Sequence, residues 1–135
     1  MAISTQRNIV KAVVDALESD VSFNAAMTGI YAGMSPDDAA LPFCRVEVLS
    51  HTPNYAFGGG RDDDMTMVVH ICTDREDSVA NLQAHMEDAL AAINEQSLTV
   101  TGWNDVQFFM ADFGFPQIEG NALGGTITGN LLITE

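Results

Sequence analysis

Apolar residues recur at helical spacing in two stretches of the chain, which predicts two amphipathic helices. In residues 4–18 the apolar positions fall on one face and the charged positions on the other. The apolar positions are Val10, Val13, Val14, Leu17 and Val21; the charged ones are Arg7, Lys11, Asp15 and Glu18. Residues 74–94 keep a longer stripe, formed by Val79, Leu82, Met86, Leu90 and Ile93. Asp74, Glu76 and Asp77 suit the positive end of this second helix.

Alternation of apolar and polar residues predicts four strands, at residues 42–50, 64–73, 106–113 and 125–134. In the first, Cys44, Val46 and Val48 share one face. In the second, the shared face carries Met65, Met67, Val69 and Ile71. A short irregular or helical stretch to Tyr31 and a polar loop to Pro42 precede them, and glycine-rich loops join the strands in pairs. The fold class is α+β: two main helices packed on a mainly antiparallel sheet of about four strands, in one domain over residues 1–135.

The net charge of the chain argues against direct binding of nucleic acid. Five Lys+Arg against nineteen Asp+Glu give a net charge of -14, so a basic patch for nucleic acid cannot be assembled. An acidic surface favours a basic protein partner instead. No apolar run approaches the roughly 20 residues of a membrane span. Two cysteines, Cys44 and Cys72, do not make a disulfide framework, so a reducing cytoplasm is expected.

The most distinctive segment is NYAFGGGRDDDMTM at residues 54–67. It has no lysine for a phosphate loop, and its glycines open a strand and not a helix, which excludes a dinucleotide fingerprint. Three adjacent aspartates cannot all turn toward one calcium ion, and no glutamate follows at EF-hand spacing. The segment is therefore interpreted as a long flexible hairpin loop between the first two strands, with a solvated acidic tip.

Searches for catalytic groups give no set with the right spacing. Cys44, His70, Cys72 and His85 match no zinc pattern, and the adjacent Ser50 and His51 point to opposite faces, which separates nucleophile from base. The D-F-G triplet at residues 112–114 lacks every other kinase motif. We therefore expect no catalytic, cofactor-binding or metal-binding residues, and no enzyme activity.

The order of these elements resembles the tail terminator (tail completion) proteins of long-tailed bacteriophages, the family of the lambda-type minor tail protein U. The resemblance rests on VVDAL, LPFCRVEVL, MTMVVHICTD, LQAHMEDAL and the closing TITGNLLITE, which span nearly the whole chain. It implies a structural protein that forms a hexameric ring on the tail tube, stops tube polymerisation and offers a surface for head attachment. The implied partners are the tail tube protein and the head–tail connector or neck protein. The implied place is the head-proximal end of the virion tail, after assembly in the host cytoplasm.

A ring is physically consistent with this chain. A domain of this length is roughly 35 Å across, so six copies leave a hole about one subunit wide, enough to pass a DNA duplex. Six copies at -14 each would carry -84, and an acidic lumen lets DNA slide through without specific binding. In this interpretation the hairpin loop is the partner-binding segment, formed by Tyr55, Phe57, Arg61, Asp62, Asp63 and Asp64. Its aromatic residues are the expected anchors.

Two other functions remain open at this point. A head–tail joining or neck protein shares the same setting but binds the head side, and only partner data separate it from a terminator. A small cytoplasmic ligand-binding α+β domain would need convergent polar side chains in a cleft under the glycine-rich loop.

Overall fold

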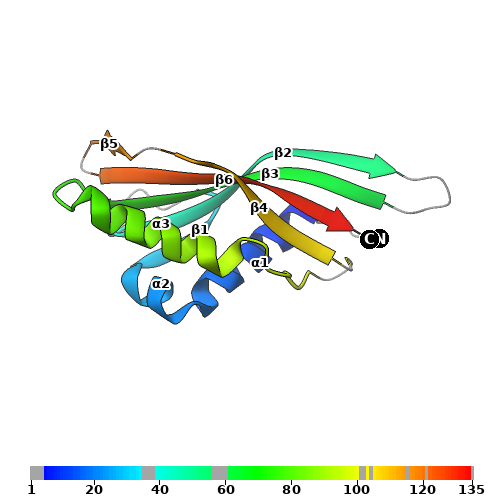
Figure 1. Ribbon diagram of the computed structural model, residues 1–135, viewed down its shortest axis with the longest axis horizontal. Helices are drawn as coiled ribbons and strands as arrows, with labels where there is room; N and C mark the ends of the chain where they lie inside the picture. The colour runs from blue at the N-terminus through cyan, green and yellow to red at the C-terminus, as the bar shows by residue number, and fades with distance from the viewer. Residues whose placement is uncertain are drawn as a thin grey trace.

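The computed structural model describes residues 5–34, 39–55, 61–100, 103, 105–114, 116–120 and 122–134. In these residues the chain forms three helices and six strands. They are, in order, α1 (Thr5–Ser19), α2 (Val21–Ala26), β1 (Gly29–Ala32), β2 (Phe43–Tyr55), β3 (Arg61–Asp74), α3 (Val79–Ile93), β4 (Asp105–Phe113), β5 (Gln117–Glu119) and β6 (Ala122–Thr134). The helices gather on one side of a twisted sheet (Figure 1). None of the described helices is long and apolar enough to cross a membrane.

The sheet has the strand order β1-β2-β3-β6-β4, and β5 pairs with the start of β6. Only β1 and β2 run parallel; the other pairs are antiparallel. Strand β6 therefore lies between β3 and β4 in the sheet. This confirms the predicted α+β class and the mainly antiparallel sheet, but the sheet has six strands where about four were expected.

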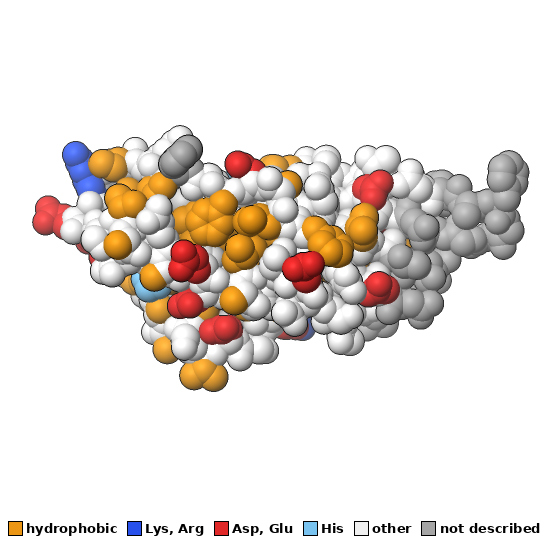
Figure 2. Space-filling view, in the orientation of Figure 1, with side chains coloured by type: hydrophobic (Ala, Val, Ile, Leu, Met, Phe, Trp, Pro, Cys, Tyr) orange, Lys and Arg blue, Asp and Glu red, His pale blue; other side chains and the backbone are white. Residues whose placement is uncertain are grey.

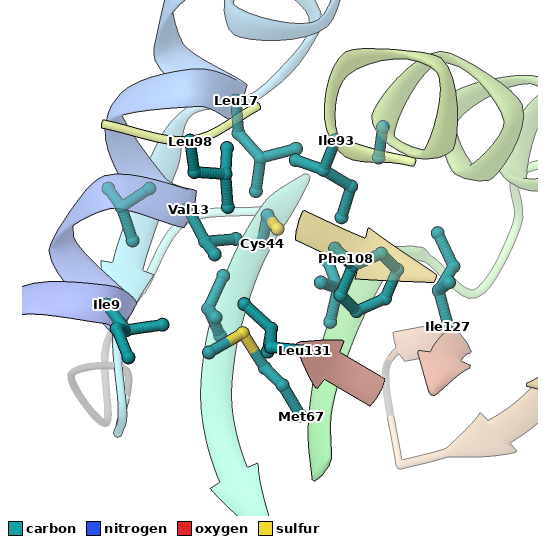
Figure 3. Close-up of a cluster of buried hydrophobic side chains, with 14 of the residues drawn as sticks. Ile9, Val13, Leu17, Cys44, Met67, Ile93, Leu98, Phe108, Ile127 and Leu131 are labelled. Carbon is teal, nitrogen blue, oxygen red and sulfur yellow. The ribbon is translucent and has the colours of Figure 1, made fainter. Parts of the chain in front are cut away.

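The core lies between the helices and the inner face of the sheet (Figure 3). It brings together apolar side chains of α1, α3, β2, β3, β4 and β6, including Ile9, Val13, Leu17, Cys44, Met67, Ile93, Phe108, Ile127 and Leu131. Each of these is fully or almost fully buried, so each contributes about 1.5–3 kcal/mol of hydrophobic stabilisation relative to an exposed side chain. The predicted inner faces of β2 and β3 are confirmed by this packing.

Two glycines on the inner face of β6 let other parts of the core approach its backbone. A Cβ on Gly125 would lie 2.4 Å from Met86 Sδ of α3, and a Cβ on Gly129 would lie 2.2 Å from Phe108 Cζ of β4. Both distances are shorter than any real contact. At Gly129 the close atoms include the backbone oxygen of Phe109 at 2.7 Å, so a side chain would force the neighbouring strand to move. At Gly125 the close atoms belong to the end of the flexible Met86 side chain, which can shift.

The helices differ from their predicted bounds at two places. The second predicted helix begins at Val79 and not at Asp74, because Asp74 is still in β3 and Ser78 caps the helix by accepting from the backbone N–H of Asn81 at 3.0 Å. Val21 is 83% exposed and does not extend the buried face of α1. It starts the separate helix α2, whose N-cap Asp20 accepts from the backbone N–H of Phe23 at 2.9 Å.

Candidate functional site

The long β2–β3 hairpin is the most prominent feature outside the core. The two strands pair from Phe43 opposite Cys72 out to Tyr55 opposite Arg61. On its other side β2 pairs with β1 as far as Val46, and beyond that residue no other described strand pairs with this side of it. The outer part of the hairpin extends past the helices (Figure 1). At this outer end β6 still pairs with β3 as far as Asp62, so the part of the sheet that lies beyond the helices contains β6 as well as the hairpin.

The edge of β2 carries two features that discourage strand addition. A β-bulge lies between Val48 and Ser50, and it leaves Leu49 56% exposed. Pro53 follows within the strand and has no backbone N–H to offer a neighbour. Bulges and prolines are the usual means by which sheet edges avoid pairing with another chain. This part of the hairpin is therefore suited to contacts through its side chains and not to pairing with a strand of another chain.

The predicted acidic loop tip is in fact strand. Arg61, Asp62, Asp63 and Asp64 belong to β3, where β2 pairs with them on one side and β6 pairs with the three aspartates on the other. The prediction failed because aspartate disfavours strands, whereas two neighbouring strands here supply hydrogen bonds to the backbone. Phe57 lies outside the described residues, as do the glycines of the loop. Tyr55 ends β2.

Asp63 is buried, contrary to the solvated position expected for it. Its side chain is 0% exposed, and its Oδ2 lies 2.5 Å from Nε2 of His51 on β2. The other ring nitrogen of His51 lies 3.3 Å from the side-chain nitrogen of Gln6 on α1. A carboxylate is stable in such a site only with close partners. Gln6, His51 and Asp63 therefore tie α1 to both strands close to the outer end of the hairpin.

Asp64 keeps the exposed position that was predicted for it. Its carboxylate accepts a hydrogen bond from the side-chain amide of Asn54 at 3.1 Å, across the β2–β3 ladder. On the face drawn in Figure 2, acidic side chains are scattered among hydrophobic ones and basic side chains are few. Together with the net charge of -14, this makes a basic partner more favourable than an acidic one.

A second feature is a hollow of about 510 Å³ at the opposite end of the sheet from the hairpin tip. Its lining includes two aromatic side chains, Phe43 and Phe113, and two nitrogen-rich ones, Arg45 and His70. Further lining comes from Cys72, Asp112, Gly114, Gln117, Gly124, Gly125 and Thr126. Most of these residues come from β2, β3 and β6, from strand positions that point away from the helices.

Beside this hollow, the carboxylate of Glu47 is hydrogen-bonded to the side chains of His70 and Arg45. Its Oε1 lies 2.8 Å from Nε2 of His70, and its Oε2 accepts from Nη1 of Arg45 at 3.0 Å. The hydrogen bond with His70, assisted by the charge of Arg45, holds the pKa of Glu47 below its ordinary value of 4.5. Arg45 and Glu47 are two residues apart in β2 and so share a face, but their pairing with His70 depends on the strand register, which the sequence does not give.

This lowered pKa predicts a small loss of stability in acid. A carboxyl whose pKa is lower in the folded state stabilises the fold above its unfolded pKa, and this contribution disappears as the pH falls through the folded value. The contribution is below about 1 kcal/mol because all three side chains are partly exposed. Urea unfolding should show that Glu47→Gln is less stable than wild type at pH 7, and that this difference is smaller at pH 3. An equal gap at both pH values would contradict this assignment.

The two cysteines are predicted to differ sharply in reactivity. Burial, with a smaller effect of Cys72, raises the pKa of Cys44 to about 12, and the thiolate is the reactive form. Cys72 is only partly buried and lines the hollow. Iodoacetamide at pH 8 should therefore modify Cys72 in the folded protein and Cys44 only after unfolding, as read by peptide mass spectrometry. Modification of Cys44 at a comparable rate in the folded state would refute the packing described here.

The described residues offer interaction surfaces more than reactive groups. Histidines 51 and 70 are each hydrogen-bonded to a carboxylate, and within the ranges described above no three or more His, Cys, Asp or Glu side chains are grouped to hold a metal ion. The residues predicted to form a partner-binding segment are brought together at the outer end of the hairpin as far as the structure describes them. Their role in binding stays a prediction.

No protein-family model matches the sequence, and no curated protein matches it either. Solved structures do share its fold. A chain in the structure of the virion of a native gene transfer agent particle is similar over 99% of this chain and 100% of that one, with a TM-score of 0.75 and 16% identity. The bacteriophage SPP1 gp17 protein is similar over 97% of this chain and 91% of that one, with a TM-score of 0.60 and 21% identity. The chain thus has the fold of a protein found in a gene transfer agent virion and of a bacteriophage protein.

Proposed function

We propose that this protein is a structural component of a phage-type virion, placed as a ring at the head-proximal end of the tail tube. There it ends polymerisation of the tube and provides the surface to which the head attaches. This proposal rests on the structural similarity to the gene transfer agent virion chain, which extends over essentially the full length of both chains. The family resemblance seen in the sequence gives the more specific role of a tail terminator.

The geometry of the hairpin supports a capping role. A ring that stops a tube must contact the last ring of tube protein on one side while its own body blocks further addition. Close to its outer end the β2–β3 hairpin is anchored to α1 by Gln6, His51 and Asp63. Its direction is therefore fixed by contacts with the helical layer and not by the loop alone. The exposed Asp64, next to Asp63 in β3, suits a basic surface on the tube protein.

Six copies in a closed ring need a heterologous interface, in which one surface of each subunit meets a different surface of the next. The net charge of -14 per chain gives such a ring an acidic character, which repels the DNA that passes through its centre. Light scattering after size exclusion tests the ring directly. We expect a mass six times the 14.5 kDa of the chain, either in the free protein or in the protein bound to tubes. A stable dimer in both conditions would contradict the ring.

The same likeness to a virion chain also favours a neck protein that joins head and tail from the head side. The two functions differ in their first partner. Pull-down of the purified protein with isolated tail tubes and with isolated tail-less heads separates them. A terminator binds tubes without heads present, whereas a neck protein binds heads without tubes.

A further inference from the structure

The register between β2 and β3 changes once along the hairpin. Before the bulge Val48 lies opposite Met67, and after it His51 lies opposite Met65, so that Leu49 is an extra residue in β2. This arrangement is called the bulged register below. Because successive residues of a strand point to opposite faces, the extra residue turns every later residue of β2 to the other face. The bulge is therefore what places His51 on the inner face of the sheet.

The same two strands can also pair without a bulge. In this bulge-free register the pairing before the bulge would continue unchanged, so that His51 would lie opposite Asp64 and Thr52 opposite Asp63. Leu49 would then have a partner in the ladder, which the bulge denies it. His51 would move to the outer face, away from Asp63. The observed structure thus has a defined competitor that differs by one residue.

Hydrophobic packing does not decide between the two registers. From Leu49 to Asn54 no side chain of β2 is buried, so the apolar pattern that usually sets the register of a strand is missing here. Strand β3 differs, because β6 pairs with its outer end and contributes the buried Leu131 and Ile133. Beyond Val46, β2 pairs with β3 alone among the described strands. Strand β2 is therefore the one that can slide.

Polar contacts on the inner face do distinguish the two registers. In the bulged register Nε2 of His51 lies 2.5 Å from the buried carboxylate of Asp63, and its Nδ1 lies 3.3 Å from the side-chain nitrogen of Gln6. The bulge-free register would lose both contacts and leave the carboxylate buried without its histidine. Removing the partner of a buried carboxylate destabilises a fold strongly. The unpaired backbone of one residue at an exposed bulge costs much less.

We propose that the contacts among Gln6, His51 and Asp63 hold β2 in the bulged register, and that β2 shifts to the bulge-free register when they are removed. These are positioning residues, which act through the backbone of β2 and determine on which face of the hairpin its last residues lie. The consequence for binding rests on the proposed function, because Tyr55, the last residue of β2, is an expected anchor for the tail tube. The register can be tested without it.

Cross-strand disulfides report the register directly. Thr52→Cys with Asp64→Cys places thiols opposite each other in the bulged register. Thr52→Cys with Asp63→Cys places them opposite each other only in the bulge-free register, and it also removes the carboxylate. Thiols on opposite faces of a hairpin cannot be bridged without backbone movement. Each variant is checked for wild-type circular dichroism and oxidised with glutathione disulfide, and peptide mass spectrometry then locates the disulfide.

We expect the disulfide between positions 52 and 64 to form while the inner contacts are intact. Adding His51→Thr to this pair should lower its formation at least tenfold, because threonine cannot reach Asp63. Adding Asp63→Asn instead should leave it unchanged, because the amide oxygen still accepts from His51. The disulfide between positions 52 and 63 should also form, because the variant that carries it lacks the carboxylate. Failure of this second disulfide, or equal formation of the first with His51→Thr, would overturn the inference.

The positioning role is tested by co-sedimentation of variants without added cysteines with isolated tail tubes. His51→Thr should bind tubes at least tenfold more weakly than wild type. The matched control is Asn54→Ala, which removes the exposed cross-strand bond to Asp64 and should bind as wild type. Normal binding by His51→Thr, once its register is shown to have shifted, would overturn the positioning role. Absence of tube binding by the wild-type protein would overturn the proposed function, whereas the disulfides would still decide the register.

Discussion

Replacing Gly129 by alanine is expected to lower the free energy of unfolding by about 3 kcal/mol. The added Cβ would lie 2.2 Å from Cζ of Phe108 and 2.7 Å from the backbone oxygen of Phe109. Phe108 is fully buried in the core and the Phe109 carbonyl belongs to the neighbouring strand β4, so neither can move away cheaply. Thermal unfolding should show a midpoint lowered by roughly 10 °C.

Gly124→Ala is the matched control for this prediction, since it makes the same change in the same strand. Its Cβ meets only ordinary contacts, so the variant should be as stable as wild type or more stable by up to about 1 kcal/mol. Equal destabilisation by the two substitutions would show that β6 does not have the inward and outward faces described here.

Replacing Tyr55 and Phe57 together by alanine should leave the fold intact and abolish binding to the tail tube or connector. Tyr55 closes the paired part of the hairpin, and Phe57 follows it in the sequence beyond the described part of β2. Aromatic anchors at the centre of an interface are commonly worth about 2 kcal/mol or more each. A loss of affinity on the order of a hundredfold or greater is therefore expected, and co-sedimentation with isolated tubes measures it.

Leu49→Ala provides the control for this double variant. Leu49 is a large side chain on the same strand, 56% exposed at the bulge, but it lies nearer the body of the subunit. Its removal should change tube binding little. If the variant lacking the Tyr55 and Phe57 side chains gave the wild-type yield of virions, the hairpin would not be part of the binding surface and would act only as a spacer.

The sequence alone was sufficient to predict the helices and strands in which apolar residues recur with a strong periodicity. Helix α1 and strands β2, β3, β4 and β6 match the predicted stretches to within several residues, because each has one buried face and one polar face. Strand β1 was missed since four residues are too few for an alternation to be recognised, and it is held by parallel pairing with β2. Strand β5 was likewise hidden in a segment that reads as a glycine-rich loop.

The site was less predictable because its chemistry depends on register. His51 and Asp63 are twelve positions apart in sequence and meet across the β2–β3 ladder, and a one-residue slip would separate them. Aspartates beside glycines are typical of turns, so their place in a strand bordered on both sides could not be inferred locally. The hollow at Gly124 also could not be predicted from the sequence, because its lining comes from five strands, β2 to β6.

The role as a terminator is tested by the length of tail tubes grown from the purified tube protein of the same virion, with and without this protein, measured by electron microscopy. Substoichiometric protein should stop elongation, with one ring of mass six times 14.5 kDa visible at one end of each tube. Tubes that grow to the same lengths at every concentration, with bare ends, would contradict it.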